Sequence, residues 1–129
     1  MPDRPTAAAL LRTALNSGDT RQLAALFHPD VRFHPAGPAE PATQGRDQAL
    51  SWYDDRRARG IRTRVEETFT YPDAVVLALR ISDPTDPAAA PTLVYRLFRL
   101  AGDHVTHIRD FTERPHALTA ADRPVPRPH

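Results

Sequence analysis

Two histidine-proline pairs stand close together in the stretch ALFHPDVRFHPAG, which spans residues 25–37. The second pair, His34 and Pro35, ends a short pattern that is typical of a strand. An imidazole group exchanges protons near neutral pH, so a histidine at the mouth of a strand can be a general acid or base. It can also be a metal ligand, or a polar residue that fixes the loop through a backbone hydrogen bond. The residues alone leave these alternatives open.

A carboxylate lies in the last alternating stretch, HVTHIRDFT, at residues 104–112. Alternation along a strand places Thr106, Ile108 and Asp110 on one face. Whether Asp110 acts as an acid or as a base depends on how deeply it is buried and on whether a guanidinium lies beside it. An aspartate that is tied into a structural ion pair is the alternative.

Arg80 is a charged residue within the apolar run AVVLALRIS, at residues 74–82, and shares a strand face with Val76 and Ala78. This face is expected to line a cavity. Burial of a guanidinium group without a partner is costly. We therefore expect Arg80 to form an ion pair with Asp110.

Several large side chains are candidates for the wall of a cavity that holds an apolar ligand. They are Leu11, Phe27, Trp52, Tyr53 and Ile108. Core packing explains them nearly as well. Tyr95 lies between Leu93 and Leu97 on one strand face, where its hydroxyl could polarise a carbonyl group or the ring could simply form pocket wall.

Some chemistries are excluded by composition and spacing. The chain has no cysteine, which rules out disulfides, zinc-thiolate sites and thiol nucleophiles. The pair His104 and His107 is a weak metal motif, because an odd spacing on a strand points the two rings to opposite faces. The five glycines are not clustered into a phosphate-binding loop. We expect neither a metal nor a cofactor.

The length and composition are those of one soluble domain: 129 residues, 40% of them hydrophobic and 26% charged. No apolar run approaches the roughly 18 residues of a membrane helix. The first residues alternate apolar and polar positions, unlike a secretory signal. We expect a cytoplasmic protein without a membrane partner.

The seventeen cationic side chains are all arginine, and sixteen acidic residues balance them to a net charge of +1. This balance provides no net field that would attract nucleic acid. The densest basic patch directly follows Asp54 and Asp55. It comprises Arg56, Arg57, Arg59, Arg62 and Arg64. For this patch we favour a solvated face over a phosphate-binding surface.

These residues are positioned by predicted helices followed by predicted strands. Thr6 and Asp19 can each cap a helix, and a third helix covers residues 46–58. A strand at residues 31–35 and a turn-rich loop at residues 36–45 lie between the second helix and the third.

Four alternating or apolar runs then predict a sheet. Its strands cover residues 61–71, 74–82, 92–100 and 104–112. Helices followed by an antiparallel meander indicate an α+β fold in which three N-terminal helices pack on one sheet face. Residues 119–129 are rich in proline and arginine and are predicted to form a disordered tail after a domain at residues 1–118.

Three stretches carry a resemblance to a known family: LLRTALNSGDTRQLAALFHPDVRFH, GRDQALSWYDDR and AGDHVTHIRDFTE. Over residues 6 to about 118 the chain resembles the SnoaL-like branch of the nuclear transport factor 2-like superfamily. The resemblance implies a cone-shaped α+β barrel, in which a curved, mainly antiparallel sheet wraps around three helices. The superfamily includes ketosteroid isomerases, epoxide hydrolases, polyketide cyclases, dehydratases and members without known catalysis.

The resemblance also implies roles for single residues. His34 stands where ketosteroid isomerase has its proton-shuttling aspartate, and Asp110 matches the last-strand aspartate of the cyclases and epoxide hydrolases. Trp52 and Tyr53 match the aromatic pair that lines the isomerase cavity. Tyr95 takes the place of the isomerase's second hydrogen-bond donor.

At two positions the sequence differs from the family patterns, and each difference argues against one reaction of the superfamily. Leu11 stands where the isomerase has a tyrosine that binds the developing enolate. Ser82 stands where epoxide hydrolases carry the first of two aspartates that hold an arginine, taken here to be Arg80. Steroid isomerisation and epoxide hydrolysis are therefore disfavoured.

The sequence thus predicts a cofactor-independent acid-base isomerase, cyclase or dehydratase for a small, apolar, oxygenated molecule. Asp110 and His34 would transfer protons, Tyr95 and Tyr53 would donate hydrogen bonds, and Arg80 would set the charge of Asp110. The alternative is a non-catalytic domain of the same fold that binds a small ligand or dimerises. A homodimer contact is expected on an outer sheet face made of Val94, Arg96, Phe98, Arg109 and Phe111.

Overall fold

Three helices lead into the sheet in the computed structural model, which describes residues 6–36, 41–86, 88 and 90–123. They are α1 (Ala7–Ser17), α2 (Thr20–Leu26) and α3 (Arg46–Ala58). The predicted caps are present, because the Thr6 hydroxyl accepts a hydrogen bond from the Ala9 amide and the Asp19 carboxylate accepts one from the Arg21 amide. Gly18 ends α1 with a left-handed φ of 71°, a conformation that favours glycine.

Six strands form one sheet in the order β2-β1-β6-β5-β4-β3. Their bounds are β1 (Phe27–His34), β2 (Thr43–Gln44), β3 (Arg62–Tyr71), β4 (Ala74–Ser82), β5 (Thr92–Ala101) and β6 (His104–Phe111). The pair β1 and β6 is parallel, and every other neighbouring pair is antiparallel. The predicted α+β fold with a mainly antiparallel sheet is confirmed.

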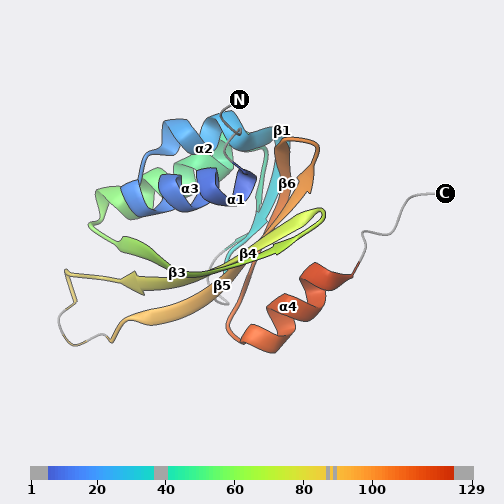
Figure 1. The fold of residues 1–129 in the computed structure, drawn as a ribbon. Coiled ribbons are helices and arrows are strands. Elements are labelled where there is room, and N and C mark those ends of the chain that lie inside the picture. The colour runs from blue at the N-terminus through green and yellow to red at the C-terminus, as the bar shows by residue number, and fades with distance from the viewer. Residues whose placement is uncertain (1–5, 37–40, 87, 89, 124–129) are drawn as a thin grey trace, which may run out of the picture.

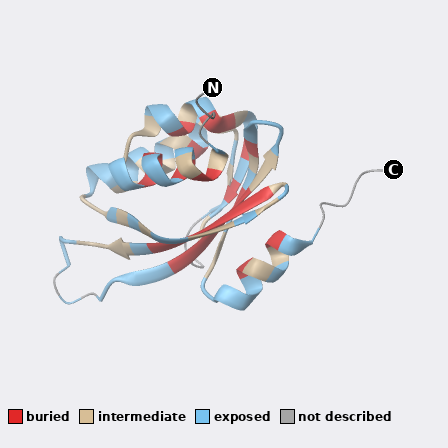
Figure 2. Ribbon diagram, in the orientation of Figure 1, coloured by how far each residue is buried: buried red, intermediate tan, exposed pale blue. Residues whose placement is uncertain are grey.

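The main hydrophobic core lies between the sheet and the three N-terminal helices, which cover one sheet face together (Figure 1). From β4 this face presents Val75, Leu77 and Leu79, and from β5 and β6 it presents Phe98 and Ile108. Figure 2 shows the buried residues concentrated in the middle of the strands and on the helix surfaces that face them. We call this sheet face the helix side.

A fourth helix, α4 (Arg114–Asp122), packs on the opposite face of the sheet (Figure 1). Its Ala117 and Ala121 lie against Val76, Ala78 and Tyr95 in a second buried cluster. The predicted disordered tail is therefore wrong for residues 119–122, which are helical, and the expected domain end at residue 118 falls inside α4. Arg123 caps the end of this helix, and residues 124–129 of the predicted tail lie outside the described residues.

Because α4 covers this second face, β4 is buried on both sides and its sequence has no alternation that reveals which face is which. The sequence pattern predicts Arg80, Val76 and Ala78 on the face that lines a cavity. They lie instead on the α4 side.

None of the helices in the described part of the chain combines the length and the apolar character that crossing a membrane requires.

Candidate ligand cavity

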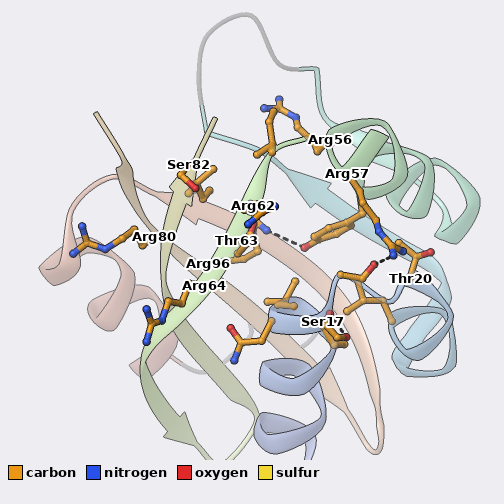
Figure 3. A pocket seen from close by; sticks show the side chains of 18 of the residues that line it. Ser17, Thr20, Arg56, Arg57, Arg62, Thr63, Arg64, Arg80, Ser82 and Arg96 are labelled. Atoms are coloured by element: carbon orange, nitrogen blue, oxygen red, sulfur yellow. Dashed lines mark hydrogen bonds between the residues drawn. The ribbon is translucent and has the colours of Figure 1, made fainter. Parts of the chain in front are cut away.

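An open cavity of about 1000 Å³ lies between α1, α3 and the facing ends of β3 and β4. This volume suits a small organic ligand. Trp52 and Tyr53 from α3 form an aromatic wall, and Arg96 from β5 lies at its inner end. Figure 3 shows the charged and polar residues around the cavity, with the dashed hydrogen bond at Arg96.

Arg96 is the centre of the polar contacts at the cavity floor. Only 1% of the residue is exposed, and its Nε lies 2.6 Å from Oδ1 of Asp110 while Nη2 lies 2.9 Å from Oδ2. The third nitrogen, Nη1, donates a hydrogen bond to the Tyr53 hydroxyl at 3.1 Å. A two-pronged ion pair with a further hydrogen bond is the arrangement that makes a buried guanidinium tolerable.

Aromatic rings surround the same guanidinium group. Its central carbon lies 5.0, 5.2 and 5.4 Å from the ring centres of Phe33, Trp52 and Tyr53. The Phe33 and Trp52 rings meet edge to face, with centres 4.7 Å apart. These cation-π contacts hold Arg96 in place and orient the Tyr53 hydroxyl beside it.

Electrostatics keeps Tyr53 protonated and Arg96 charged. Burial raises the pKa of Tyr53 to about 12, against the opposing influence of the Arg96 charge. Burial alone would lower the pKa of Arg96, but the Asp110 carboxylate and the Tyr53 oxygen raise it overall. Because the Tyr53 oxygen accepts a hydrogen bond from Arg96, its own proton can be donated to an oxygen atom of a ligand.

Asp110 points to the helix side, the face on which the sequence placed it with Ile108. Its side chain is 3% exposed, and Oδ2 also accepts a hydrogen bond from the Ala36 amide at 3.2 Å. The carboxylate therefore ties β6 to β5 and to the segment after β1. It lies behind Arg96 and is not among the residues that line the main cavity.

The expected ion pair between Arg80 and Asp110 is wrong. Arg80 lies on the α4 side of β4 with its side chain 54% exposed, and it pairs with Glu66 of β3. Arg96 is the residue directly opposite Asp110 in the β5-β6 pairing. Sequence reasoning missed Arg96 because it assigned this residue to the outer face.

His34 and Asp110 do not share the main cavity, as neither residue lines it. Phe33 faces the helix side, so the neighbouring His34 is exposed on the other face, opposite Arg109 in the pairing with β6. Both His34 and Asp110 border a second, smaller hollow of about 580 Å³ near His116. There the imidazole is exposed, whereas the carboxylate is turned toward Arg96.

Tyr95 is placed on the α4 side, where it is 8% exposed and packs in the second buried cluster. The expectation that its hydroxyl points into the ligand cavity is wrong, because on β5 the helix side belongs to Val94, Arg96 and Phe98. Tyr53 is the tyrosine whose hydroxyl lies at the cavity floor.

The five predicted wall residues all belong to the main core, on the helix side of the sheet. Trp52 and Tyr53 line the cavity itself. Leu11, Phe27 and Ile108 are fully buried and fill the core beside it.

The surface that was expected to form a homodimer does not exist as one face. Val94, Arg96 and Phe98 are buried under the helices, with at most 5% of any one of them exposed. Arg109 and Phe111 lie on the opposite face, where the guanidinium stands 5.1 Å from the ring centre.

Solved structures with the same fold come from several organisms. A proposed polyketide cyclase from Sinorhizobium meliloti is 18% identical, with a TM-score of 0.67 over 81% of this chain and 93% of that one. A nuclear transport factor 2-like protein of unknown function from Cytophaga hutchinsonii is 17% identical, with a TM-score of 0.65 over 92% and 99%. A protein with a ketosteroid isomerase-like fold from Catenulispora acidiphila, in complex with trimethylamine, is 17% identical, with a TM-score of 0.68 over 95% and 96%.

These similarities define the class as the nuclear transport factor 2-like fold. The model of the SnoaL-like domain family matches residues 7–108, and the chain belongs to that family. None of the curated proteins compared with the chain matches it. The resemblance noted from the sequence is confirmed at the level of family and fold.

Proposed function

We propose that this protein binds a small, apolar molecule with a carbonyl or enol oxygen in the main cavity and promotes its isomerisation, cyclisation or dehydration. Tyr53 donates a hydrogen bond to that oxygen. The observation that carries the proposal is the chain of contacts from Tyr53 through Arg96 to Asp110 at the cavity floor. No cofactor takes part in the proposed chemistry.

The proposed role of Tyr53 follows from charge development. When a carbon-hydrogen bond beside a carbonyl group breaks, the electron pair moves onto the oxygen, which becomes an enolate. A donor that is already held in place stabilises that charge without having to reorganise. Arg96 holds the Tyr53 oxygen, and its positive charge favours an anion nearby. Asp110 is then a positioning residue, because it holds Arg96 and does not touch the ligand.

The described lining of the main cavity contains no aspartate, glutamate or histidine. A proton that leaves the substrate carbon therefore passes to water. This suits substrates whose carbon-bound hydrogen is already acidic, such as those with a second carbonyl or an aromatic ring beside it. For them, stabilisation of the enolate contributes more than a strong base. The enolate carbon then takes back a proton from water, which completes an isomerisation. Alternatively, it attacks a second carbonyl carbon and closes a ring, while the oxygen of that carbonyl takes the electron pair and a proton from water. Loss of the resulting hydroxyl group together with a neighbouring proton, as water, completes a dehydration.

Epoxide hydrolysis receives less support. In the epoxide hydrolases of the superfamily an arginine is held by two aspartates, one of them two residues after it. Arg96 is held here by Asp110, and the residue two positions after Arg96 is Phe98, which has no carboxylate.

A non-catalytic ligand-binding domain is the second candidate function. The absence of a carboxylate or an imidazole from the described cavity lining favours it. The same cavity would then bind the oxygenated molecule through Tyr53 without changing it.

Deuterium exchange of 2-tetralone distinguishes the enzyme from the non-catalytic binding domain. This ketone has a CH2 group between its carbonyl group and its aromatic ring, and the hydrogens of that group are the ones that exchange. Nuclear magnetic resonance in heavy water follows the exchange, and 2-naphthol, which resembles the enol, serves as the competing ligand. The enzyme proposal predicts exchange faster than in buffer, inhibition by 2-naphthol and a loss of the acceleration in Tyr53→Phe. Binding of 2-naphthol without faster exchange would favour the binding domain, and absence of both would contradict the proposal.

A further inference from the structure

Among the described residues that line the main cavity, all the charged ones are of one sign. The described lining includes six arginines and no carboxylate. The arginines are Arg56, Arg57, Arg62, Arg64, Arg80 and Arg96 (Figure 3). They come from α3, β3, β4 and β5, so only the folded chain brings them together. Arg62, Arg64 and Arg80 share one face of the β3-β4 pair, the α4 side, and border the cavity from there. Four of them belong to the basic patch for which the sequence favours a solvated face.

Two of these arginines already have a carboxylate partner. Arg96 is paired with Asp110, and Arg80 is paired with Glu66. Arg64 lies close enough to Glu66 to help lower the pKa of that carboxyl group, after the larger effect of Arg80. Arg96 and Arg80 therefore contribute little net charge to the cavity, whereas Arg64 has no carboxylate of its own among these contacts.

Arg57 and Arg62 have no such partner within the described residues. Arg57 is exposed at the end of α3, and its Nη1 donates to the carbonyl oxygen of Gly18 at 2.8 Å, a neutral acceptor. Arg62 is exposed at the start of β3. Both residues line the cavity and are exposed, whereas Arg96 is buried, so they lie at the mouth of the cavity and Arg96 at its floor.

The acidic residues that precede the arginines in the sequence do not compensate this charge. Asp54 accepts a hydrogen bond from the Thr20 hydroxyl at 2.9 Å, and Asp55 pairs with Arg59 at 3.4 Å. Neither carboxylate lines the cavity. The mouth therefore carries an excess of positive charge.

Another arginine, Arg56, lies at the aromatic wall of the cavity. The guanidinium of Arg56 lies 4.6 Å from the ring centre of Trp52. Burial, and then the positive charges of Arg59 and Arg96, lower the pKa of Arg56. Arg56 thus lies within reach of the positive charges of Arg59 and Arg96 and of the negative charge of Asp110.

We propose that the ligand of this cavity carries an anionic oxygen group, a carboxylate or a phosphate, at the end remote from Tyr53. The apolar body of the ligand packs on Trp52, and its anionic end binds Arg57 and Arg62 at the mouth. A guanidinium fork matches the oxygen atoms of both anions. This inference rests on the proposed function for the position of the ligand, and it adds the class of substrate.

Isothermal titration calorimetry with three related ligands tests the inference. They are 2-naphthol, which is neutral, and two anions that keep its hydroxyl group and add a charged group at the far end: 6-hydroxy-2-naphthoate, with a carboxylate, and 6-hydroxy-2-naphthyl phosphate. We expect at least one of the two anions to bind about tenfold more tightly than 2-naphthol, the gain of one charge-assisted contact. The anion that gains more identifies the preferred group.

The variants Arg57→Gln and Arg62→Gln, singly and together, locate the anion. Glutamine retains a donor for the Gly18 carbonyl and removes the charge. We expect the double variant to lose the preference for the anion and to bind 2-naphthol as the parent does. Arg32→Gln is the matched control, because Arg32 is exposed on β1 and does not line the cavity. It should keep the preference.

The outcomes separate the inference from the proposed function. If 2-naphthol binds in a Tyr53-dependent way but the anions bind no better, the inference is overturned and the proposed function stands. If the preference for the anion persists in the double variant, the anion binds elsewhere and the inference is likewise overturned. If none of the three ligands binds, both fall.

Discussion

Arg96 and Asp110 face each other across the β5-β6 hairpin, and a shift of one residue in the pairing makes them partners. Next to the turn, Leu100 pairs with Val105, whereas one step further on Arg99 pairs with His107. The extra residue, Thr106, forms a bulge, and its hydroxyl donates to the Arg99 carbonyl at 3.5 Å. Without this bulge, regular counting from the turn would place Arg109 opposite Arg96. Two arginines would then meet where the ion pair now lies.

Asp110→Asn should be strongly destabilising, because it keeps the shape of the side chain but leaves the Arg96 charge buried without a counterion. We expect a loss of roughly 3–5 kcal/mol in the free energy of unfolding, measured by urea denaturation. Glu66→Gln removes the partner of Arg80 in an exposed pair and serves as the control, with a much smaller loss. Similar losses in the two variants would show that the buried pair has no special importance.

Much of the fold could be predicted from local patterns. The predicted third helix and the predicted strand at residues 74–82 have the bounds that the structure shows for α3 and β4. The faces of β4 and β5 could not be predicted, because both strands are buried on both sides and lack a polar alternation. α4 was missed because its apolar contacts are made mainly by small alanines, which give a weak periodic signal.

Only part of the candidate site could be predicted, because the two faces of β5 could not be told apart from the sequence. Asp110, Trp52 and Tyr53 were identified, since the pattern of the last strand and the aromatic pair on α3 are visible in the sequence. Arg96 was assigned to the wrong face. The signal that could have found it is the hairpin, since pairing from the turn brings Arg96 within one residue of Asp110.

The stability of the protein should fall at high pH because of Tyr53. Folding raises the pKa of this tyrosine to about 12, whereas the unfolded chain releases the same proton at about pH 10. The contribution to stability is complete below about pH 10 and is lost as the pH rises toward 12. Urea denaturation of the parent and of Tyr53→Phe across this range checks it. The stability difference between them should change in favour of Tyr53→Phe as the pH rises, and a constant difference would contradict the assignment.

The contact of α4 with the sheet should contribute to stability. Ala117 is fully buried against the second cluster, whereas Thr119 on the same helix is exposed. Ala117→Asp places a charge in this contact and should cost about 2 kcal/mol or more, whereas Thr119→Asp should change stability by roughly 0.5 kcal/mol or less. Thermal unfolding of both variants tests this. An equal effect would mean that α4 does not dock on the sheet in solution.

Trp52 should report on the cavity, because it is the single tryptophan of the chain and lines the wall beside Arg96. Arg96→Met removes the guanidinium that lies over its ring and should shift the fluorescence spectrum. Arg32→Met removes a charge from an exposed position on β1 outside the cavity and should leave the spectrum unchanged. Equal spectra for both variants and the parent would argue against the contact between Arg96 and Trp52.

The most direct test of the central claim is a crystal structure of the protein with 2-naphthol. The account predicts that the naphthol lies on Trp52 in the main cavity, with its oxygen about 2.7 Å from the Tyr53 hydroxyl oxygen. A naphthol bound at the second hollow beside His34, or one bound in the main cavity with its oxygen turned away from Tyr53, would contradict it.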